Sequence, residues 1–212
     1  SWNILGPPDF MVRSIAIDPV NPSKIIIGTT GRGIFKSTDG GSTWTNTTDS
    51  GNIHTLVFSP AGDRVYAAFS AGAVSNGVLR STDGGNTWTT VKANAGITSI
   101  AFDPSSPSTV YICGQTGIYK SRDDGATWDY VLTQTGMTSI VVDPKTPSTL
   151  YAANQSFGVY KSTDGGVNWT VINNGLDSHQ VISLAIDPIN PSTVYAGLYG
   201  YGVYKTTNGG NS

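Results

Sequence analysis

The stretch Ser81–Trp88 reads STDGGNTW, and this eight-residue pattern, called the box below, returns along the chain. Further copies are STDGGSTW at Ser37–Trp44, SRDDGATW at Ser121–Trp128 and STDGGVNW at Ser162–Trp169. A fifth copy, TTNGGNS at Thr206–Ser212, carries Asn208 in place of the aspartate and lacks the tryptophan. Successive copies begin 40 to 44 residues apart. A period of this length predicts a repeat protein whose unit is about four short strands.

Each repeat predicts four β-strands around its box. A short apolar run such as SLAI ends at Asp-Pro, because proline has no N–H for a strand ladder. Runs such as TVYAG and GVYKS predict the second and third strands, and the fourth begins at the box tryptophan. We therefore expect an all-β chain forming one five-bladed β-propeller over 1–212. Its blades are predicted at about 12–49, 53–92, 97–133, 137–173 and 181–212 plus 1–5.

The fifth tryptophan, Trp2, lies at the other end of the chain. The box tryptophans at 44, 88 and 128 each lie ten residues before the middle of the strand that opens the following repeat. Trp2 lies eleven residues before Arg13, which is the matching position of the first repeat. We therefore expect Trp2 to complete the box that TTNGGNS begins. Residues 1–5 would then form the fourth strand of the last blade, which closes the ring and removes two sheet edges.

The box side chains predict a turn and no catalytic role. A short carboxylate accepts N–H groups that a turn leaves open, glycines supply positive φ, and the indole covers the turn. The residues assigned to this structural role are Asp39, Trp44, Asp83, Trp88, Asp123, Trp128, Asp164, Trp169, Asn208 and Trp2. The turns lack the ligand spacing of calcium loops, so we predict no metal and no cofactor.

Composition excludes several classes of partner. Only 12% of the 212 residues are charged, and the net charge is −2, so neither nucleic acid nor an anionic membrane surface is an expected partner. No apolar run approaches the roughly 18 residues of a membrane span, so no membrane insertion is expected. The one cysteine, Cys113, excludes an internal disulfide and is expected to be a small buried core residue.

The variable loops predict the binding face. The two repeated turn motifs of each blade fall on one face, so the loops that differ between blades fall on the other. Candidate ligand-binding residues there are Arg32, Phe157, Tyr199, Tyr201, Phe10 and His179. Aromatic faces with a few polar groups suit a sugar ring or the anchor of a protein partner. Alternatively, the aromatic rings merely fill the mouth of the central channel, which His54 is expected to border.

The pattern S-x-D-x-G-x-T-W resembles the Asp-box, or BNR repeat. Propellers that carry it include sialidases, xyloglucan-degrading glycoside hydrolases, sortilin-type receptor domains and photosystem assembly factors, so the resemblance implies a fold and no single activity. Sialidases resemble one another in an arginine triad and a tyrosine nucleophile assisted by glutamate. This chain has no Glu, and only Arg13 and Arg32 could reach the loop face, so sialidase activity is not expected.

Two functions remain open. The leading hypothesis is a non-catalytic binding or scaffold module that recognises a glycan or protein partner through its variable loops. The alternative is a xyloglucanase-type glycoside hydrolase that uses two of Asp9, Asp49 and Asp177, since such enzymes place paired carboxylates about 5 to 9.5 Å apart. Three sequons, at Asn46, Asn154 and Asn168, favour an extracellular or cell-surface setting.

Overall fold

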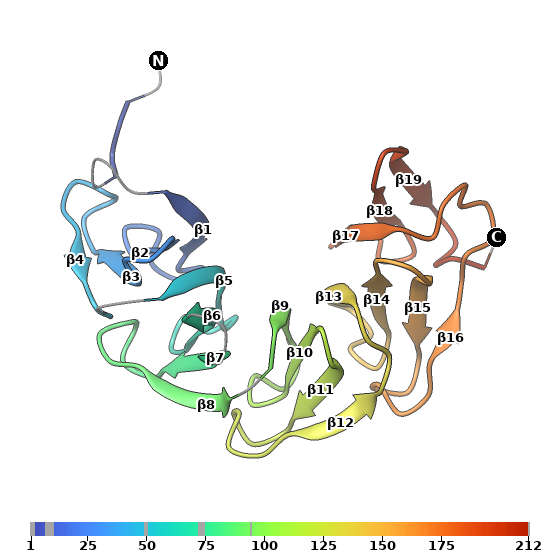
Figure 1. Ribbon diagram of the computed structural model, residues 1–212, viewed down its shortest axis with the longest axis horizontal. Helices are drawn as coiled ribbons and strands as arrows, with labels where there is room; N and C mark the ends of the chain where they lie inside the picture. Colours follow the sequence, from blue (N-terminus) through green and yellow to red (C-terminus); the bar gives the residue numbers. More distant parts are fainter. Residues whose placement is uncertain (1–2, 7–10, 49–50, 72–74, 94, 212) are drawn as a thin grey trace. The chain divides into compact units, whose positions relative to one another are not determined.

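Five antiparallel β-sheets follow one another along the chain in the computed structural model (Figure 1). The structure describes residues 3–6, 11–48, 51–71, 75–93 and 95–211. None of these residues forms a helix that could cross a membrane. The chain divides into two units, residues 1–97 and 98–212. We describe each unit by itself.

The first unit contains two four-stranded sheets. The first sheet has the order β1 (Val12–Ile17), β2 (Ile25–Thr29), β3 (Ile34–Ser37) and β4 (Thr45–Asn46). The second sheet has the order β5 (Asn52–Phe58), β6 (Val65–Ala71), β7 (Ser75–Ser81) and β8 (Thr89–Ala93). Ile26, Ile53 and Val65 are fully buried in a core that both sheets share, and Trp88 packs against this core.

The second unit contains three sheets. The third sheet of the chain has the order β9 (Ile97–Phe102), β10 (Val110–Gly114), β11 (Gly117–Ser121) and β12 (Asp129–Leu132). The fourth has the order β13 (Met137–Val142), β14 (Leu150–Asn154), β15 (Gly158–Ser162) and β16 (Thr170–Val171). The fifth has only β17 (Val181–Ile186), β18 (Val194–Leu198) and β19 (Gly202–Thr206). Apolar cores lie between consecutive sheets of this unit.

The prediction of an all-β chain is confirmed, with one antiparallel sheet for each box. The fourth strand expected for the last sheet is not formed by residues 3–5, and Trp2 lies outside the described residues. Leu5 contacts the first box, where its carbonyl accepts a hydrogen bond from Trp44 Nε1 at 2.5 Å and its side chain lies over Gly41. The structure therefore leaves the outer edge of β19 without a partner strand among the described residues.

A β-bulge interrupts the first strand of at least four sheets. The pairing register shifts across Arg13 in β1, His54 in β5, Thr138 in β13 and Ile182 in β17. A bulge leaves one residue outside the ladder and re-aims its side chain. The position that the sequence singled out as bordering the central channel is therefore a bulge in these four sheets.

Candidate binding face

One hydrogen-bond pattern builds the box turns. In the first copy, the Asp39 carboxylate accepts the Thr43 N–H at 2.9 Å, the Thr43 hydroxyl at 2.6 Å and the Ser37 hydroxyl at 2.8 Å. The Ser37 oxygen in turn accepts the N–H of Gly41 at 2.8 Å. Asp83, Asp123 and Asp164 accept equivalent bonds in their own turns. The structure thus gives these carboxylates turn-forming contacts.

The same bonds stabilise the ionised form of these acids. Hydrogen bonds from Thr43 and Thr127 lower the pKa of Asp39 and Asp123 to about 2, and the Asn168 N–H does most to lower that of Asp164 to about 2. A general acid requires the opposite shift, toward the working pH. The box aspartates are therefore poorly suited to donate a proton.

The aspartates of the Asp-Pro turns act in a similar way. Asp18 accepts the N–H groups of Val20 at 2.8 Å and Asn21 at 3.1 Å, and it pairs with Lys24 at 2.5 Å. Asp103, Asp143 and Asp187 accept the N–H groups two and three residues further on. Eight aspartates of the sequence therefore serve turns of the two repeated kinds.

Basic residues near the ends of β11 and β15 link neighbouring sheets of the second unit. Lys120 Nζ donates to the carbonyl of Gly165 at 2.9 Å, and Lys161 Nζ donates to that of Gly209 at 2.8 Å. Both acceptors are the first glycine of the next box. Tyr111 and Tyr151 donate their hydroxyls to the same carbonyls. A Tyr–Lys pair therefore holds the following box in place.

Three loops of the second unit come together on the variable-loop side. They are residues 155–157 after β14, residues 173–180 after β16 and residues 199–201 after β18. The Gly158 N–H donates to His179 O at 2.9 Å, and the Tyr199 N–H donates to Gln180 O at 2.9 Å. Asn173 Nδ2 donates to Phe157 O at 2.9 Å. The middle loop is thus hydrogen-bonded to both of its neighbours.

Two adjoining shallow depressions lie in these loops, each of about 360 Å³. They share Ser156 and Gln180, and their other lining residues are Asp177, Ser178 and His179 in one and Gln155, Ile182 and Tyr199 in the other. Tyr199 is 68% exposed, Tyr201 58% and Phe157 52%. Three solvent-exposed aromatic rings therefore stand in turns that also supply polar groups.

The structure brings together some of the predicted site residues. Asp177, His179 and Tyr199 line the depressions, and Phe157 and Tyr201 belong to the same turns. The sequence did not single out Gln155, Ser156 and Gln180, whose only signal is their position in non-repeated loop segments. Asp177 accepts a hydrogen bond from Tyr204 at 2.5 Å, which is the main cause of the raised pKa of Tyr204.

The other predicted residues lie in the first unit or outside the described residues. Arg32 occupies the turn between β2 and β3, where its carbonyl accepts a bond from Asn46 Nδ2 at 3.2 Å. Phe10, Asp9 and Asp49 are outside the described part of the chain. The aromatic cluster of the second unit is therefore the part of the predicted site whose geometry can be described.

Arg13 and His54 meet in the first unit, at two bulges. Arg13 donates to Thr30 Oγ1 at 2.9 Å and lies 3.5 Å from His54 Nδ1, while His54 Nε2 lies 2.7 Å from Ser70 Oγ. Burial, with a smaller effect of the Arg13 charge, lowers the pKa of His54. The imidazole is consequently neutral near pH 7.

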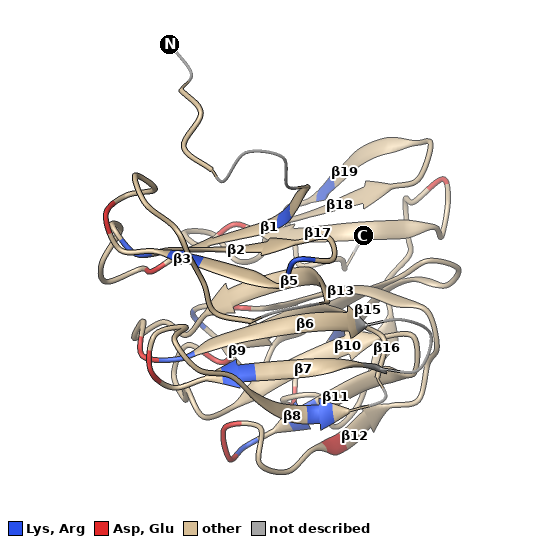
Figure 2. Cartoon of the chain, turned by 60° about the vertical axis from the view of Figure 1, so that its left-hand side comes forward, with Lys and Arg blue, Asp and Glu red and all other residues tan. Residues whose placement is uncertain are grey.

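The described ranges contain no candidate metal cluster, and their one cysteine is buried. Among the residues with described positions, no three His, Cys, Asp or Glu side chains form a group that could hold a metal ion. Cys113 is fully buried, and burial raises the pKa of its thiol to about 12. The positions of charged residues are sparse along the cartoon in Figure 2, and the acidic residues lie mainly in turns.

Comparisons with known proteins give a fold. No protein-family model matches the chain, and no curated protein matches it. An ancestral GH74 enzyme matches with a TM-score of 0.81 and 24% identity, over 96% of this chain and 31% of that one. The GH74 xyloglucanase from Xanthomonas campestris matches with a TM-score of 0.72 and 20% identity, over 92% of this chain and 36% of that one.

A third solved structure is not described as an enzyme. YCF48 from Cyanidioschyzon merolae matches with a TM-score of 0.70 and 17% identity, over 98% of this chain and 70% of that one. The chain spans about a third of the length of the two GH74 enzymes. At these identities the likeness shows the fold alone, which is that of a β-propeller.

Proposed function

We propose that this chain is a non-catalytic binding propeller that recognises a glycan or a protein partner through its variable loops. The observation that carries this proposal is the cluster of Phe157, Tyr199 and Tyr201, more than half exposed in adjoining turns. Exposed aromatic faces stack on the apolar faces of sugar rings or receive a partner's anchor side chain. Ser156, Asp177 and Gln180 supply hydrogen-bonding groups beside them.

The geometry of the depressions also favours binding over hydrolysis. Their described lining contains a single carboxylate, that of Asp177. Hydrolysis of a glycosidic bond by the usual route needs two carboxyl groups, about 5 to 9.5 Å apart. The depressions are shallow, whereas an enzyme site buries its substrate more completely.

The likeness to GH74 enzymes is the reason to consider a second candidate function. A xyloglucanase-type activity would use Asp177 together with Asp9 or Asp49, both of which lie outside the described residues. The likeness to YCF48 places the same fold in a protein that is not a GH74 enzyme. Fold likeness alone therefore does not decide between the two functions.

Binding is tested on a glycan array and by calorimetry with any glycan that gives a signal. We expect Tyr199→Ala and Tyr201→Ala to weaken binding at least tenfold. Tyr130→Ala is the matched control, because Tyr130 is 45% exposed on β12 and packs against Tyr119. Equal loss in the control would contradict a site in these loops. A chain that binds no glycan is next tested against candidate protein partners.

Hydrolysis is tested separately on a panel of β-glucans. We expect no turnover by the unmodified chain. Turnover that disappears in Asp177→Asn, while glycan binding persists, would establish the glycosidase and overturn the non-catalytic proposal. The two assays are independent because one measures bound glycan and the other measures new reducing ends.

We further propose that the five sheets form a ring of five blades, which Ser1–Leu5 closes as the fourth strand of the last blade. The regular box spacing supports this count, and the three-stranded fifth sheet leaves an edge for the closing strand. We also propose an extracellular or cell-surface location. Of the three sequons, Asn46 and Asn168 are exposed, whereas Asn154 is fully buried and donates to Thr135 O at 2.7 Å. A glycan on Asn154 is therefore incompatible with the fold.

A further inference from the structure

The core between the fourth and fifth sheets lacks a tryptophan. In the core between the third and fourth sheets, Trp169 packs against the buried residues of both sheets. In the core of the first unit, Trp88 occupies the corresponding place. The core between β13–β16 and β17–β19 contains no tryptophan among its described residues.

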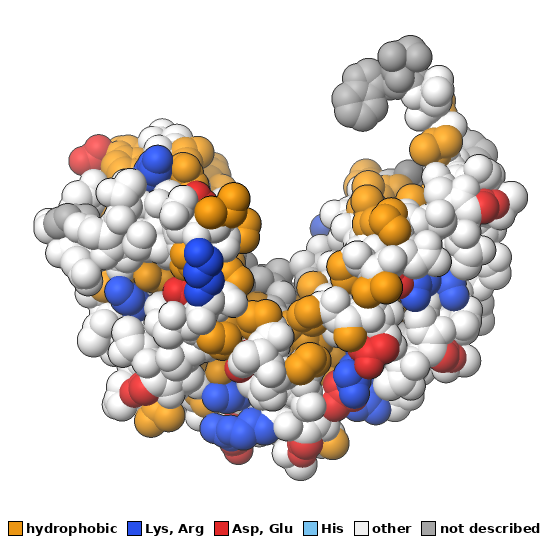
Figure 3. Space-filling view, turned by 180° about the vertical axis from the view of Figure 1, so that it is seen from behind, with side chains coloured by type: hydrophobic (Ala, Val, Ile, Leu, Met, Phe, Trp, Pro, Cys, Tyr) orange, Lys and Arg blue, Asp and Glu red, His pale blue; other side chains and the backbone are white. Residues whose placement is uncertain are grey.

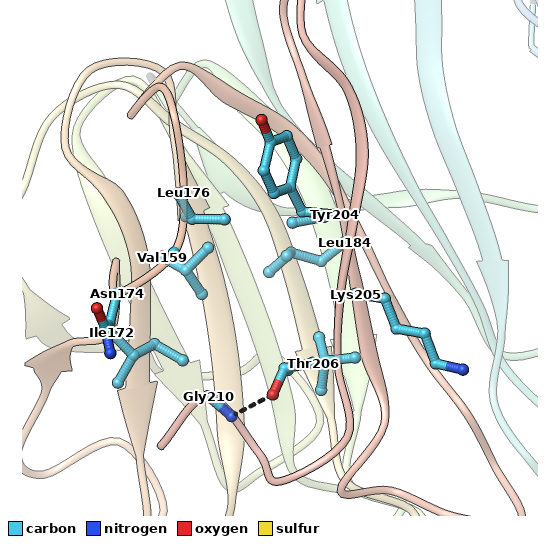
Figure 4. Close-up of a pocket in the computed structure, with 12 residues that line it drawn as sticks. Val159, Ile172, Asn174, Leu176, Leu184, Tyr204, Lys205, Thr206 and Gly210 are labelled. Atoms are coloured by element: carbon cyan, nitrogen blue, oxygen red, sulfur yellow. Dashed lines mark hydrogen bonds between the residues drawn. The ribbon is translucent and has the colours of Figure 1, made fainter. Parts of the chain in front are cut away.

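A cavity occupies this core, with a volume of about 140 Å³ (Figure 4). Leu176 is one of its apolar lining residues, and the others are Val159, Ile172, Leu184, Val194, Ala196 and Tyr204. Their counterparts one repeat earlier are Ile118, Val131, Ile140, Leu150, Ala152 and Tyr160, all of which belong to or pack against the core that holds Trp169. The cavity therefore has the walls of an indole site without the indole.

The size and the floor of the cavity agree with this equivalence. A protein cavity of about 150 Å³ with apolar walls accepts a benzene ring. Gly210 lines the cavity and bonds through its N–H to Thr206 Oγ1 at 3.1 Å (Figure 4). The equivalent Gly166 lies beneath the Trp169 ring, which would contact an added Cβ at 3.7 Å. At Gly210 an added Cβ would collide with Ile172, so this position also requires glycine.

The cavity adjoins an open strand edge. Tyr204, Lys205 and Thr206 of β19 line it, and β19 pairs only with β18 among the described residues. In the third and fourth sheets, the strand that begins just after the box tryptophan pairs with the third strand at this edge. An occupant would therefore place an indole in the cavity and pair its following residues with β19, as in β-strand addition.

We propose that this cavity is an indole site, and that Trp2 of the segment Ser1–Leu5 of the same chain fills it. Leu5, three residues after Trp2, lies over Gly41 of the first box. Val131 and Ile172, each three residues after a box tryptophan, lie in the same way against Gly166 and Gly210. The segment thus has the register of a fourth strand. This inference rests on the proposed ring, in which Ser1–Leu5 is the strand that pairs with β19.

The test uses the full chain and free indole as the probe. We expect Trp2→Ala to lower the melting temperature and to create a site that indole refills. Indole at ten times its dissociation constant should raise the melting temperature of this variant by about 3–6 °C. It should leave the unmodified chain unchanged, because its site is already filled. Adding Ala196→Leu to Trp2→Ala, which narrows the cavity, should abolish the rescue.

A second measurement covers the case in which Trp2→Ala does not fold. The emission of the unmodified chain minus that of Trp2→Phe isolates the fluorescence of Trp2. We expect blue-shifted emission, protected from acrylamide at least fivefold relative to free tryptophan. Trp2 emission that is fully quenchable, or an equal indole-induced rise in the unmodified chain, would overturn the proposal.

The source of the strand has its own test. We expect a monomeric mass and a melting temperature independent of protein concentration. A doubled mass that Trp2→Ala abolishes would assign the strand to a second copy and overturn closure within one chain. Loss of closure would leave the aromatic loop cluster intact, so glycan binding by the unmodified chain distinguishes failure of this inference from failure of the proposed function.

Discussion

The box aspartate is the residue that most directly links sequence to stability. Its carboxylate accepts a main-chain N–H, a hydroxyl or amide four residues on, and the hydroxyl of the residue that opens the box. These bonds favour the charged form, so the pKa of Asp164 falls to about 2, below the ordinary value of about 3.9. Stability from such a group is present above the unfolded pKa and is lost as the pH falls toward the folded one.

We therefore expect Asp164→Asn to lower the melting temperature at pH 6 and to have little effect at pH 2, where the native carboxyl is itself becoming neutral. Thermal unfolding followed by circular dichroism across this range measures the difference. Asn208→Asp is the reciprocal variant, because Asn208 already accepts the Thr206 hydroxyl at 2.8 Å without a charge. This variant should have a higher melting temperature than the unmodified chain at pH 6 and the same melting temperature at pH 2. An equal effect at both values would contradict the linkage.

Threonine side chains in the first strands of the sheets form hydrogen bonds to the neighbouring sheet. The Thr98 hydroxyl donates to Met137 O at 2.9 Å, and the Thr138 hydroxyl donates to Val181 O at 2.8 Å. A threonine at this position therefore bridges the first strands of successive sheets. Ile182 has no hydroxyl to offer and is half exposed.

We expect Thr138→Val to destabilise the chain by about 0.5–1.5 kcal/mol, because it removes one hydrogen bond and keeps the shape of the side chain. Urea unfolding measures the change in the free energy of unfolding. Thr89→Val on β8 is the control, since Thr89 is exposed. The prediction would be contradicted by equal effects in the two variants.

The sequence predicted the sheets well because their signals are local. The predicted blade 137–173 contains the sheet from Met137 to Val171, since Asp-Pro, the box and the alternating runs each mark a strand end. The bulge at Thr138 was not predictable, because a bulge depends on pairing with a distant strand. The hydrogen bonds of the 173–180 loop to Phe157 and Gly158 also depend on tertiary packing. The place of Gln155 and Gln180 in the depressions therefore has no local signal in the sequence.

At the scale of the whole molecule, the Tyr–Lys pairs connect one repeat to the next. Tyr151 and Lys161 meet the carbonyl of Gly209. The corresponding Tyr195 and Lys205 are stacked, with Nζ 5.5 Å from the ring centroid, but meet no box carbonyl among the described residues. Figure 3 shows hydrophobic side chains at the surface over the part of the chain with β17–β19, where Tyr195, Ile182 and Val203 are exposed.

Ring closure predicts that Lys205 is as important as Lys161. We expect Lys161→Met to destabilise the chain by about 1.5 kcal/mol, because it leaves a carbonyl without its charged donor. In the proposed ring Lys205 has a neighbouring box as acceptor, so Lys205→Met should cost a similar amount in urea unfolding. If Lys161→Met lowers the free energy of unfolding and Lys205→Met leaves it unchanged, then Lys205 has no neighbouring box and the ring is not closed.

The packing of Trp169 also affects how repeats can be gained or lost. Its indole belongs by sequence to the fourth repeat, yet it fills the core between the third and fourth sheets. Nearest-neighbour packing of this kind makes stability close to a sum over adjacent repeats. A gene duplication or deletion that adds or removes one whole repeat therefore preserves the packing between neighbouring sheets. A cut between a box and its tryptophan removes the indole from the core between two neighbouring sheets, unless the two ends of the chain pair again.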